Sequence, residues 1–318
     1  MRRHTLTSLL FVSTMLLTRH ALGQDANIAL PVPRVDSLLR HGTIKPVAAQ
    51  GSRFHGDRTE HALLFFNDST AFEVKWAVAA RGGEAFNNQP RYEAAAYELQ
   101  RLYLGEHDYV VPPTVLRMIP GSVFGTANLR GEPTFDDTPS VLVALQYWTM
   151  DVTPEDVFDT KRAERDSVYA RHLGDLNVLT YLIRQRDANK GNILIATDPA
   201  KPRLFAVDNG VAFESQPSNR GTEWQHMRVD RISAATAARL RAISDETLTK
   251  ALGVVAQFER RGDEYVTVAP GPNLDPKRGI RRNATTLQIG LTASEIKGVR
   301  ERLRDLIERV DRGKVRTF

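Results

Sequence analysis

The clearest pattern near the start of the chain is a pair of apolar runs joined by a turn. Residues 61–66 and 72–78 are mainly apolar, and residues 67–70 read Asn-Asp-Ser-Thr, a combination typical of turns. Two antiparallel strands of one hairpin are therefore predicted. Because side chains alternate along a strand, Lys75 points from one face of the second strand. The opposite face carries Phe72, Val74 and Trp76.

Helical spacing follows the hairpin. Apolar residues recur every three or four positions from Tyr92 to Tyr103, with Pro90 near the start and Gly105 beyond the end. The pattern predicts an amphipathic helix with Glu93 in its first turn. Two further strands are predicted at 110–118 and 141–148, and the glycine-containing stretch between them, 120–140, is interpreted as an insertion or flap.

The second half of the chain is predicted to be mainly helical. One long helix is expected to run directly into Asp187, and its apolar face consists of Leu173, Leu176, Leu179 and Ile183. After Asp208 we expect mainly helix and loop. The last helix begins with the capping-box sequence Thr292-Ala293-Ser294-Glu295.

Residues 1–23 differ from the rest. Two arginines precede an apolar run from Leu6 to Leu17, and Ala21-Leu22-Gly23 supplies small residues for cleavage. This pattern predicts a signal peptide cut before Gln24, and hence an exported protein, periplasmic or secreted. The run of 12 residues is shorter than the ~20 that a membrane span needs, so we expect no stable membrane anchor.

Residues 24–41 are predicted to form an exposed lead-in, because Pro31 and Pro33 interrupt regular structure. The folded part is expected to begin near Gly42.

Charge and cysteine content narrow the function classes. The chain has 43 basic and 38 acidic residues, and removal of residues 1–23 takes away three arginines, which lowers the net charge from +5 to +2. The remaining basic residues are scattered among acids, so no nucleic-acid partner is expected. The chain contains no cysteine, which excludes thiol catalysis and cysteine-ligated metals. Hydrolase and zinc-enzyme motifs are also missing from the sequence.

The most informative polar residues lie in two segments, 186–195 (RDANKGNILI) and 204–210 (LFAVDNG). Phosphoryl transfer needs a carboxylate beside the acceptor hydroxyl and oxygen ligands for Mg²⁺ or Mn²⁺. Asp187, Asn192 and Asp208 offer these groups at a spacing that one loop and one short hairpin can bring together. Each also has a structural interpretation, since Asp and Asn are common turn formers.

These segments resemble the protein-kinase-like superfamily, with its Asp-x-x-x-x-Asn loop and downstream Asp-x-Gly. Residues 177–183 (NVLTYLI) are similar to the corresponding helix of phosphatidylinositol 3/4-kinase-like proteins. Residues 91–102 (RYEAAAYELQRL) and 111–115 (VPPTV) resemble the Golgi casein kinase and Four-jointed secretory-pathway kinases. The resemblance implies a two-lobed α+β fold, with an antiparallel sheet and one helix in an N-lobe (42–148) and a mainly helical C-lobe (149–318).

The resemblance also implies roles for individual residues. Lys75 would contact the α and β phosphates of ATP, and Glu93 would hold Lys75. Asp187 would be the catalytic base, and Lys190 would reach the γ-phosphate. Asn192 and Asp208 would bind the metal. Gln146, Tyr147 and Trp148 would form the hinge beside the adenine. Gly51 would belong to a phosphate-covering loop at residues 50–57.

Together these features predict an exported ATP-dependent kinase that uses Mg²⁺ or Mn²⁺ and transfers a phosphoryl group to a hydroxyl on a protein, glycan or lipid headgroup. Two alternatives remain open from the sequence. One is a pseudokinase that binds nucleotide and acts as a scaffold. The other is a kinase-fold transferase that moves a nucleotidyl or another group.

Overall fold

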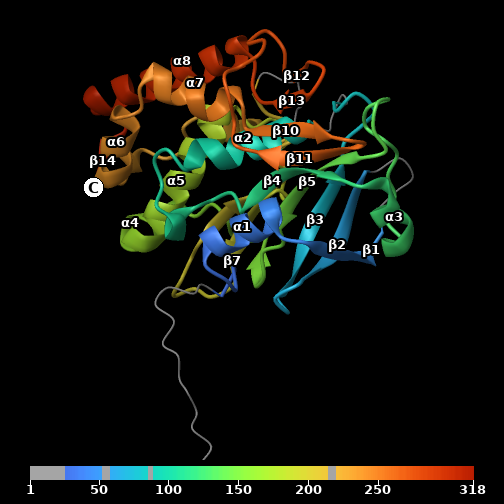
Figure 1. The fold of residues 1–318 in the computed structure, drawn as a ribbon. Coiled ribbons are helices and arrows are strands. Elements are labelled where there is room, and N and C mark those ends of the chain that lie inside the picture. The colour runs from blue at the N-terminus through green and yellow to red at the C-terminus, as the bar shows by residue number, and fades with distance from the viewer. Residues whose placement is uncertain (1–25, 52–57, 85–88, 214–219) are drawn as a thin grey trace, which may run out of the picture.

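The computed structural model describes residues 26–51, 58–84, 89–213 and 220–318, so the predicted signal peptide and its cleavage site lie outside the described residues. A sheet-rich part and a helical part lie side by side, which confirms the α+β class (Figure 1). None of the helices in the described ranges combines the length and apolar character that crossing a membrane requires.

The sheet-rich part is one antiparallel sheet in the order β1-β2-β3-β5-β4. In chain order its strands span Ile44–Gln50, Thr59–Phe66, Ala71–Val78, Thr114–Ile119 and Val141–Tyr147. Strands β2 and β3 form the predicted hairpin. Lys75 on β3 lies opposite His61 on β2 and Gln146 on β5, so these three side chains share one face of the sheet.

The other face of the sheet is apolar and covered. Val74 and Trp76 are fully buried there, as the alternation predicted. The stretch 120–140 contributes helix α3 (Gly121–Ala127), whose Phe124 packs edge-on against Trp76 with ring centroids 5.7 Å apart. This stretch therefore begins as a packed helix that covers the sheet.

Helix α1 (Val32–His41) corrects the prediction of an exposed, irregular lead-in. Pro33 lies in the first turn, where a missing N–H breaks no helical hydrogen bond and the fixed φ of proline suits a helix. The helix buries Val35, Leu38 and Leu39 in the apolar cluster of the sheet. The folded part therefore begins before Gly42.

Helix α2 (Pro90–Gln100) confirms the predicted helix and has Glu93 in its first turn. Almost all of its residues are buried, because α2 packs on the sheet and on the helical part at the same time. Its last residue, Gln100, accepts from Val110 N and Val111 N at 2.8 Å and donates to Val111 O at 2.7 Å. These bonds fix the end of α2 to the chain that enters β4.

Helix α5 (Ser167–Ile183) is the long helix that the sequence predicted. Asp166 caps it by accepting from Val168 N and Tyr169 N. A small sheet in the order β6-β7-β8 follows, formed by Val152–Thr153, Ile193–Ala196 and Leu204–Ala206. Residues 184–192 connect α5 to β7, and β8 ends directly before Val207 and Asp208. The helix and this sheet thus hold the two polar segments.

A four-stranded antiparallel sheet that was not predicted from the sequence lies after Asp208, in a region that is otherwise mainly helix and loop, as expected. Its order is β11-β10-β13-β12, and β10–β13 span Ala256–Arg261, Glu264–Val268, Ile280–Arg282 and Thr286–Ile289. The strands are short, β10 and β12 are rich in charge, and Phe258 carries much of the apolar signal of β10. Phe258 is buried in the main apolar cluster, and β10 pairs with β11 and β13, so tertiary contacts stabilise this strand.

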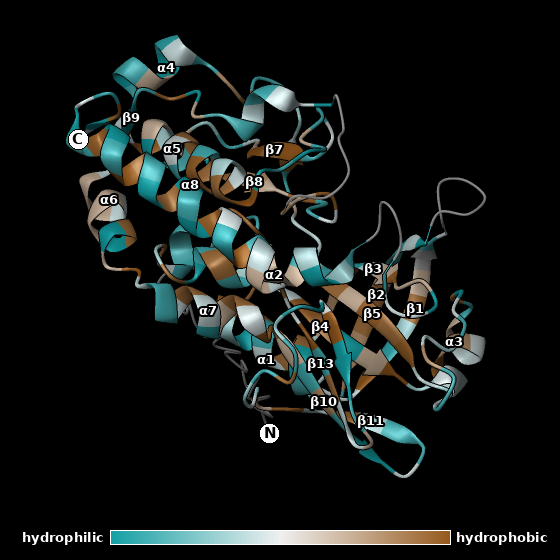
Figure 2. Cartoon of the chain, turned by 90° about the horizontal axis from the view of Figure 1, so that it is seen from above, coloured by the Kyte–Doolittle hydropathy of each residue, from teal (hydrophilic) through white to brown (hydrophobic). Residues whose placement is uncertain are grey.

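The remaining elements are mostly helical. They are α4 (Thr160–Arg165), η1 (Glu106–Asp108), η2 (Thr222–Gln225), β9 (Arg231–Ile232), α6 (Ala234–Arg241), α7 (Asp245–Gly253), α8 (Ala293–Asp311) and β14 (Arg316–Thr317). The predicted capping box of α8 is confirmed, since Thr292 and Glu295 exchange both of its hydrogen bonds. Figure 2 shows α8 crossing the helical part towards α2.

Asp175 is a buried carboxylate in the middle of α5. Burial raises its pKa to about 7, although the Thr236 hydroxyl donates a hydrogen bond to it at 2.7 Å. An acid whose pKa is higher in the folded protein than in the unfolded chain binds more protons when folded. Its contribution to stability is therefore fully present at acidic pH and falls as the pH rises from about 4 to about 7.

Asp175→Asn should stabilise the protein at pH 8, on the order of 4 kcal/mol, and change its stability little at pH 4. The amide keeps the oxygen that accepts from Thr236 and removes the charge that burial penalises. Urea denaturation of both proteins between pH 4 and pH 8 measures the difference. A difference in unfolding free energy that stays constant over this range would show that Asp175 does not titrate as described.

Candidate active site

Three charged side chains from distant parts of the chain meet at the centre of the site. Lys75 Nζ on β3 lies 2.7 Å from Glu93 Oε1 on α2 and 3.0 Å from Asp208 Oδ1 after β8. Glu93 is almost fully buried, whereas the side chain of Asp208 is 43% exposed. The carboxylate of Asp208 is therefore accessible to a ligand from solvent, while Glu93 holds the lysine from behind.

The charge state of Lys75 follows from these contacts. Burial alone would lower the pKa of the ammonium group, but Asp208 and Glu93 more than offset this effect and raise the pKa above its ordinary value. Lys75 thus stays protonated. A fixed positive charge at the base of a site suits the binding of phosphate oxygens.

The Asp-Asn-Gly segment, residues 208–210, is hydrogen-bonded to α2 through Asn209. Asn209 N donates to Glu93 Oε2 at 2.9 Å, so Glu93 binds Lys75 with one oxygen and the backbone of the Asp-Asn-Gly segment with the other. Asp208 has a φ of +58°, a left-handed conformation that few non-glycine residues adopt and that aspartate tolerates better than most. Such backbone conformations cluster at functional sites.

Gln185 connects the two polar segments and was not identified from the sequence as a structural link. Its fully buried amide donates to Asn209 Oδ1 at 2.9 Å and to Asp208 O at 3.3 Å, and its oxygen accepts from Asp187 N at 3.3 Å. The sequence signal for this role was a glutamine directly after the end of an apolar helix. Because it bonds to both segments, Gln185 fixes the position of Asp187 relative to Asp208.

The loop between α5 and β7 presents Asp187 and Asn192 together. Asn192 Nδ2 donates to Asp187 O at 2.6 Å and lies 3.4 Å from Asp187 Oδ2. Among the described residues, Asp187 Oδ1 is buried and has no hydrogen-bond partner. An unpartnered carboxylate oxygen is able to accept a proton from a hydroxyl, and Asn192 keeps its amide oxygen for another ligand.

A cavity of about 430 Å³ opens beside this group, between the sheet and the β7–β8 hairpin. This volume lies in the range of small-molecule sites. Its wall includes the predicted residues Gly51, Lys75, Gln146, Tyr147, Trp148, Asn192 and Asp208. It also includes Thr59, Glu60 and His61, whose roles in lining a site were not predicted. Every second residue of β2 lies on the same face of the sheet as Lys75. His61, opposite Lys75, is one of them, so strand alternation was the sequence signal for its place on the cavity wall.

The three predicted hinge residues line the cavity in different ways. Gln146 is buried and donates to Thr114 Oγ1 at 2.9 Å. The ring of Tyr147 packs against Phe72 on the other face of the sheet. The half-exposed Trp148 stacks on His61 with ring centroids 4.1 Å apart, which places a flat apolar surface at the mouth of the cavity.

Solved structures with a similar fold include the structure of hydra Fam20 with sugar, with 14% identity, a TM-score of 0.49, and coverage of 89% of this chain and 88% of that one. The crystal structure of the Golgi casein kinase has 13% identity, a TM-score of 0.49 and coverage of 89% and 76%. Its complex with Mn and ADP has 13% identity, a TM-score of 0.48 and coverage of 87% and 74%.

The chain is similar to these solved structures in its fold. No family model and no curated protein sequence matches the chain. At 13–14% identity, the similarity to these three structures concerns the fold alone.

Among the predicted site residues, Glu93, Asp187 and Lys190 do not line the cavity. The exposed side chain of Lys190 pairs with Glu155, Nζ to Oε2 at 2.6 Å, and does not line the cavity. Gly51 lies on the cavity wall, where a Cβ atom would meet no atom within 4 Å among the described residues. Residues 52–57 of the predicted phosphate-covering loop lie outside the described residues. The phosphate contacts of Lys190 and Gly51 therefore stay predictions.

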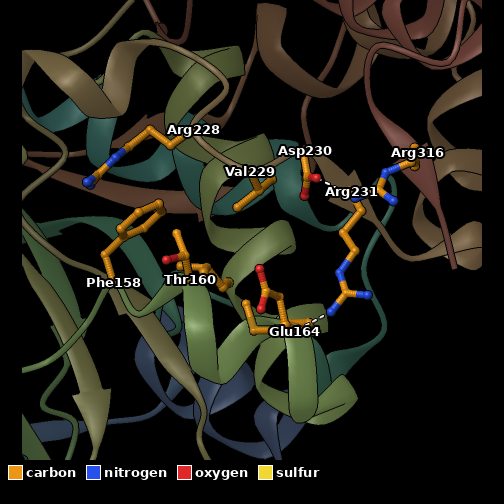
Figure 3. A pocket seen from close by; sticks show the side chains of 11 residues that line it. Phe158, Thr160, Glu164, Arg228, Val229, Asp230, Arg231 and Arg316 are labelled. Atoms are coloured by element: carbon orange, nitrogen blue, oxygen red, sulfur yellow. Dashed lines mark hydrogen bonds and ion pairs between the residues drawn. The ribbon is translucent and has the colours of Figure 1, made fainter.

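A second cavity, of about 370 Å³, lies between α4, α5 and the segment that leads into β9 (Figure 3). Arg228 stacks there on Phe158, with its guanidinium carbon 3.7 Å from the ring centroid. Arg316 pairs with Asp230. This cavity borders the first half of α5, whereas Asp187 follows the end of that helix, so it is separate from the site around Lys75.

Proposed function

We propose that this protein is an ATP-dependent phosphotransferase whose acceptor is a hydroxyl on a protein, glycan or lipid headgroup. The observation that carries the proposal is the group formed by Lys75, Glu93 and Asp208 at the wall of a nucleotide-sized cavity. Asp187 and Asn192 lie on the adjoining loop, which Gln185 ties to the same group. Phosphoryl transfer uses positive groups that hold the phosphates, oxygen ligands for a metal and a carboxylate that positions the acceptor hydroxyl, and these residues offer all three.

Each residue has a role in this proposal. The triphosphate lies along Lys75, which Glu93 keeps in place, and the base enters the cavity between Gln146 and Trp148. Asp187 orients the acceptor hydroxyl and takes its proton as the new phosphate ester bond forms. The bond between the γ-phosphate and ADP breaks in the same transfer, so the products are the phosphorylated acceptor and ADP.

The oxygen ligands at the site suit Mg²⁺ or Mn²⁺. The described residues contain no cluster of three or more His, Asp or Glu side chains that could hold a metal ion. Mg²⁺ commonly binds one or two protein oxygens, with water and substrate phosphates completing the shell. Asp208 and the amide oxygen of Asn192 fit this pattern. The bound metal would neutralise part of the phosphate charge.

Thermal unfolding with ATP, ADP or GTP, each with and without Mg²⁺ or Mn²⁺, tests nucleotide binding. ATP with metal should raise Tm by roughly 5 °C at 100 times its Kd, because a ligand of the native state stabilises it. Release of ADP in the presence of candidate acceptors then tests transfer. Binding without any transfer would favour the pseudokinase, and transfer of AMP would favour a nucleotidyltransferase. If no nucleotide shifts Tm, the proposal fails.

Export through residues 1–23 and the boundary between the lobes at 148/149 are also proposals. Sequencing the amino terminus of the exported protein tests the first of them, and the expected terminus is Gln24. Retention of Met1 in the mature protein would contradict cleavage.

A further inference from the structure

The start of α8 is tied to the start of α2 by a buried network. Glu295 accepts from Arg91 Nη1 at 2.5 Å, from Arg91 Nη2 at 2.8 Å and from Tyr92 OH at 2.5 Å. Arg91 and Tyr92 directly precede Glu93 on α2, although they lie about 200 residues from Glu295 in sequence. The contacts therefore join the last long helix to the turn that carries the partner of Lys75.

The contacts of the network stabilise the charged forms of Arg91 and Glu295 in one arrangement. Burial alone would raise the pKa of Glu295, but the hydrogen bonds and charge of Arg91 more than offset this and lower it, so Glu295 stays ionised. Gly279 packs on the guanidinium group, where a Cβ atom would approach Arg91 Nε to 2.5 Å. Arg91 also pairs through Nε with the partly exposed Glu84. The buried pair still resists separation, because losing Arg91 would leave the buried carboxylate of Glu295 uncompensated.

The same helix also holds the chain that leads to Asp187. Arg302 Nε on α8 donates to Leu182 O near the end of α5 at 2.8 Å. Tyr181 OH donates to Asp305 Oδ2 at 2.5 Å. Glu295 and Arg302 are seven residues apart, roughly 10 Å along a helix. A single rigid element thus contacts both α2, which carries Glu93, and the helix that runs into the loop of Asp187.

We propose that Glu295 is a positioning residue that keeps Glu93 in contact with Lys75 and Asn209. This inference rests on the proposed phosphotransferase function. Through Arg91 and Tyr92, Glu295 fixes the rotation and tilt of the first turn of α2 relative to the helical part. The contact between Glu93 and Lys75 is then maintained by the packing of α8 on α2. Because α8 also contacts α5, it sets the distance between Glu93 and Asp187.

The capping box makes a clean variant available. Glu295→Gln keeps the N-cap interaction with Thr292, because glutamine serves in a capping box as glutamate does. It removes the α8 charge that pairs with Arg91 and leaves Glu84 as the remaining acidic partner. Thr292→Ala is the matched control, since it weakens the cap and leaves the Arg91 pair in place. Glu308→Gln, an exposed carboxylate on the same helix, controls for charge.

Glu295→Gln should lower kcat/KM for ATP roughly 5- to 100-fold, the usual range for coupling between two sites, and should speed amide hydrogen exchange in residues 90–100. Thr292→Ala should lower Tm and leave kcat/KM unchanged. In a Glu93→Gln background, Glu295→Gln should have little further effect on kcat/KM, because it acts through Glu93.

Independent, multiplicative effects of the two substitutions would overturn the positioning role, as would unchanged exchange in residues 90–100. Hydrogen exchange needs no activity. If the wild-type protein transfers nothing, the proposed function fails, while the exchange comparison still shows whether Glu295 holds α2.

Discussion

Asp187→Asn is expected to lower the rate of phosphoryl transfer about 10²–10⁴-fold, the usual effect of losing a general base, while the affinity for ATP stays nearly unchanged. The buried oxygen Oδ1 of Asp187 has no hydrogen-bond partner among the described residues. The short bond from Asn192 Nδ2 goes to the backbone carbonyl of Asp187, and asparagine keeps a side-chain oxygen for the longer contact at 3.4 Å, so the loop stays intact. Only the group that accepts the hydroxyl proton is lost.

The measurement for Asp187 is ADP release or phosphate incorporation, combined with an ATP titration of both proteins. Asp198→Asn is a matched control, because Asp198 is an exposed turn residue between β7 and β8 whose side chain accepts from Ala200 N. The control should transfer at the wild-type rate. A wild-type rate in Asp187→Asn would remove Asp187 from the role of base.

Substitution of Asp208 should abolish the dependence of nucleotide binding on metal. The loss should exceed the roughly 10–100-fold effect of residues that only support a metal ligand. Asp208 supplies the exposed carboxylate of the site, and it also contacts Lys75 at 3.0 Å. Alanine at a φ of +58° would add backbone strain, so Asp208→Asn is the better variant, because asparagine tolerates this conformation.

Titration of ATP into wild-type and Asp208→Asn protein, with and without Mn²⁺, measures this effect. Wild-type protein should bind more tightly with Mn²⁺, whereas the variant should show one weak affinity in both conditions. Asp198→Asn again controls for loss of a carboxylate. If Mn²⁺ strengthens binding to the variant as much as to the wild type, Asp208 is not a metal ligand.

Several features were predictable because they depend on short-range sequence patterns, such as the alternation of side chains in a strand and the spacing of apolar residues in a helix. Alternation along residues 72–78 placed Lys75 on the polar face of β3, and helical spacing placed Glu93 in the first turn of α2. The Thr292-to-Glu295 capping box marked the start of α8. The structure brings Lys75 and Glu93 into the contact that the resemblance implied, and it also brings Asp208 to Lys75, a contact that was not predicted.

Other features depend on tertiary contacts that no local period encodes. Proline occurs both in loops and in the first turn of helices, so Pro33 alone does not distinguish the two. The burial of Leu39 under the sheet favours the helix α1. The charged strand β10 is defined by the packing of Phe258. The pair formed by Arg91 and Glu295 joins residues 204 positions apart. These features follow from packing between segments that are distant in sequence.

We propose that Asp208 and Asn192 bind a metal when a nucleotide occupies the adjoining cavity. The most direct test is a crystal structure with Mn²⁺ and a non-hydrolysable ATP analogue, with anomalous scattering measured for manganese. The predicted result is an anomalous peak between the side-chain oxygens of Asp208 and Asn192, with phosphate oxygens at Lys75 and the base beside Gln146 and Trp148. A nucleotide bound elsewhere, or a manganese peak away from Asp208 in crystals that contain the nucleotide, would contradict the claim.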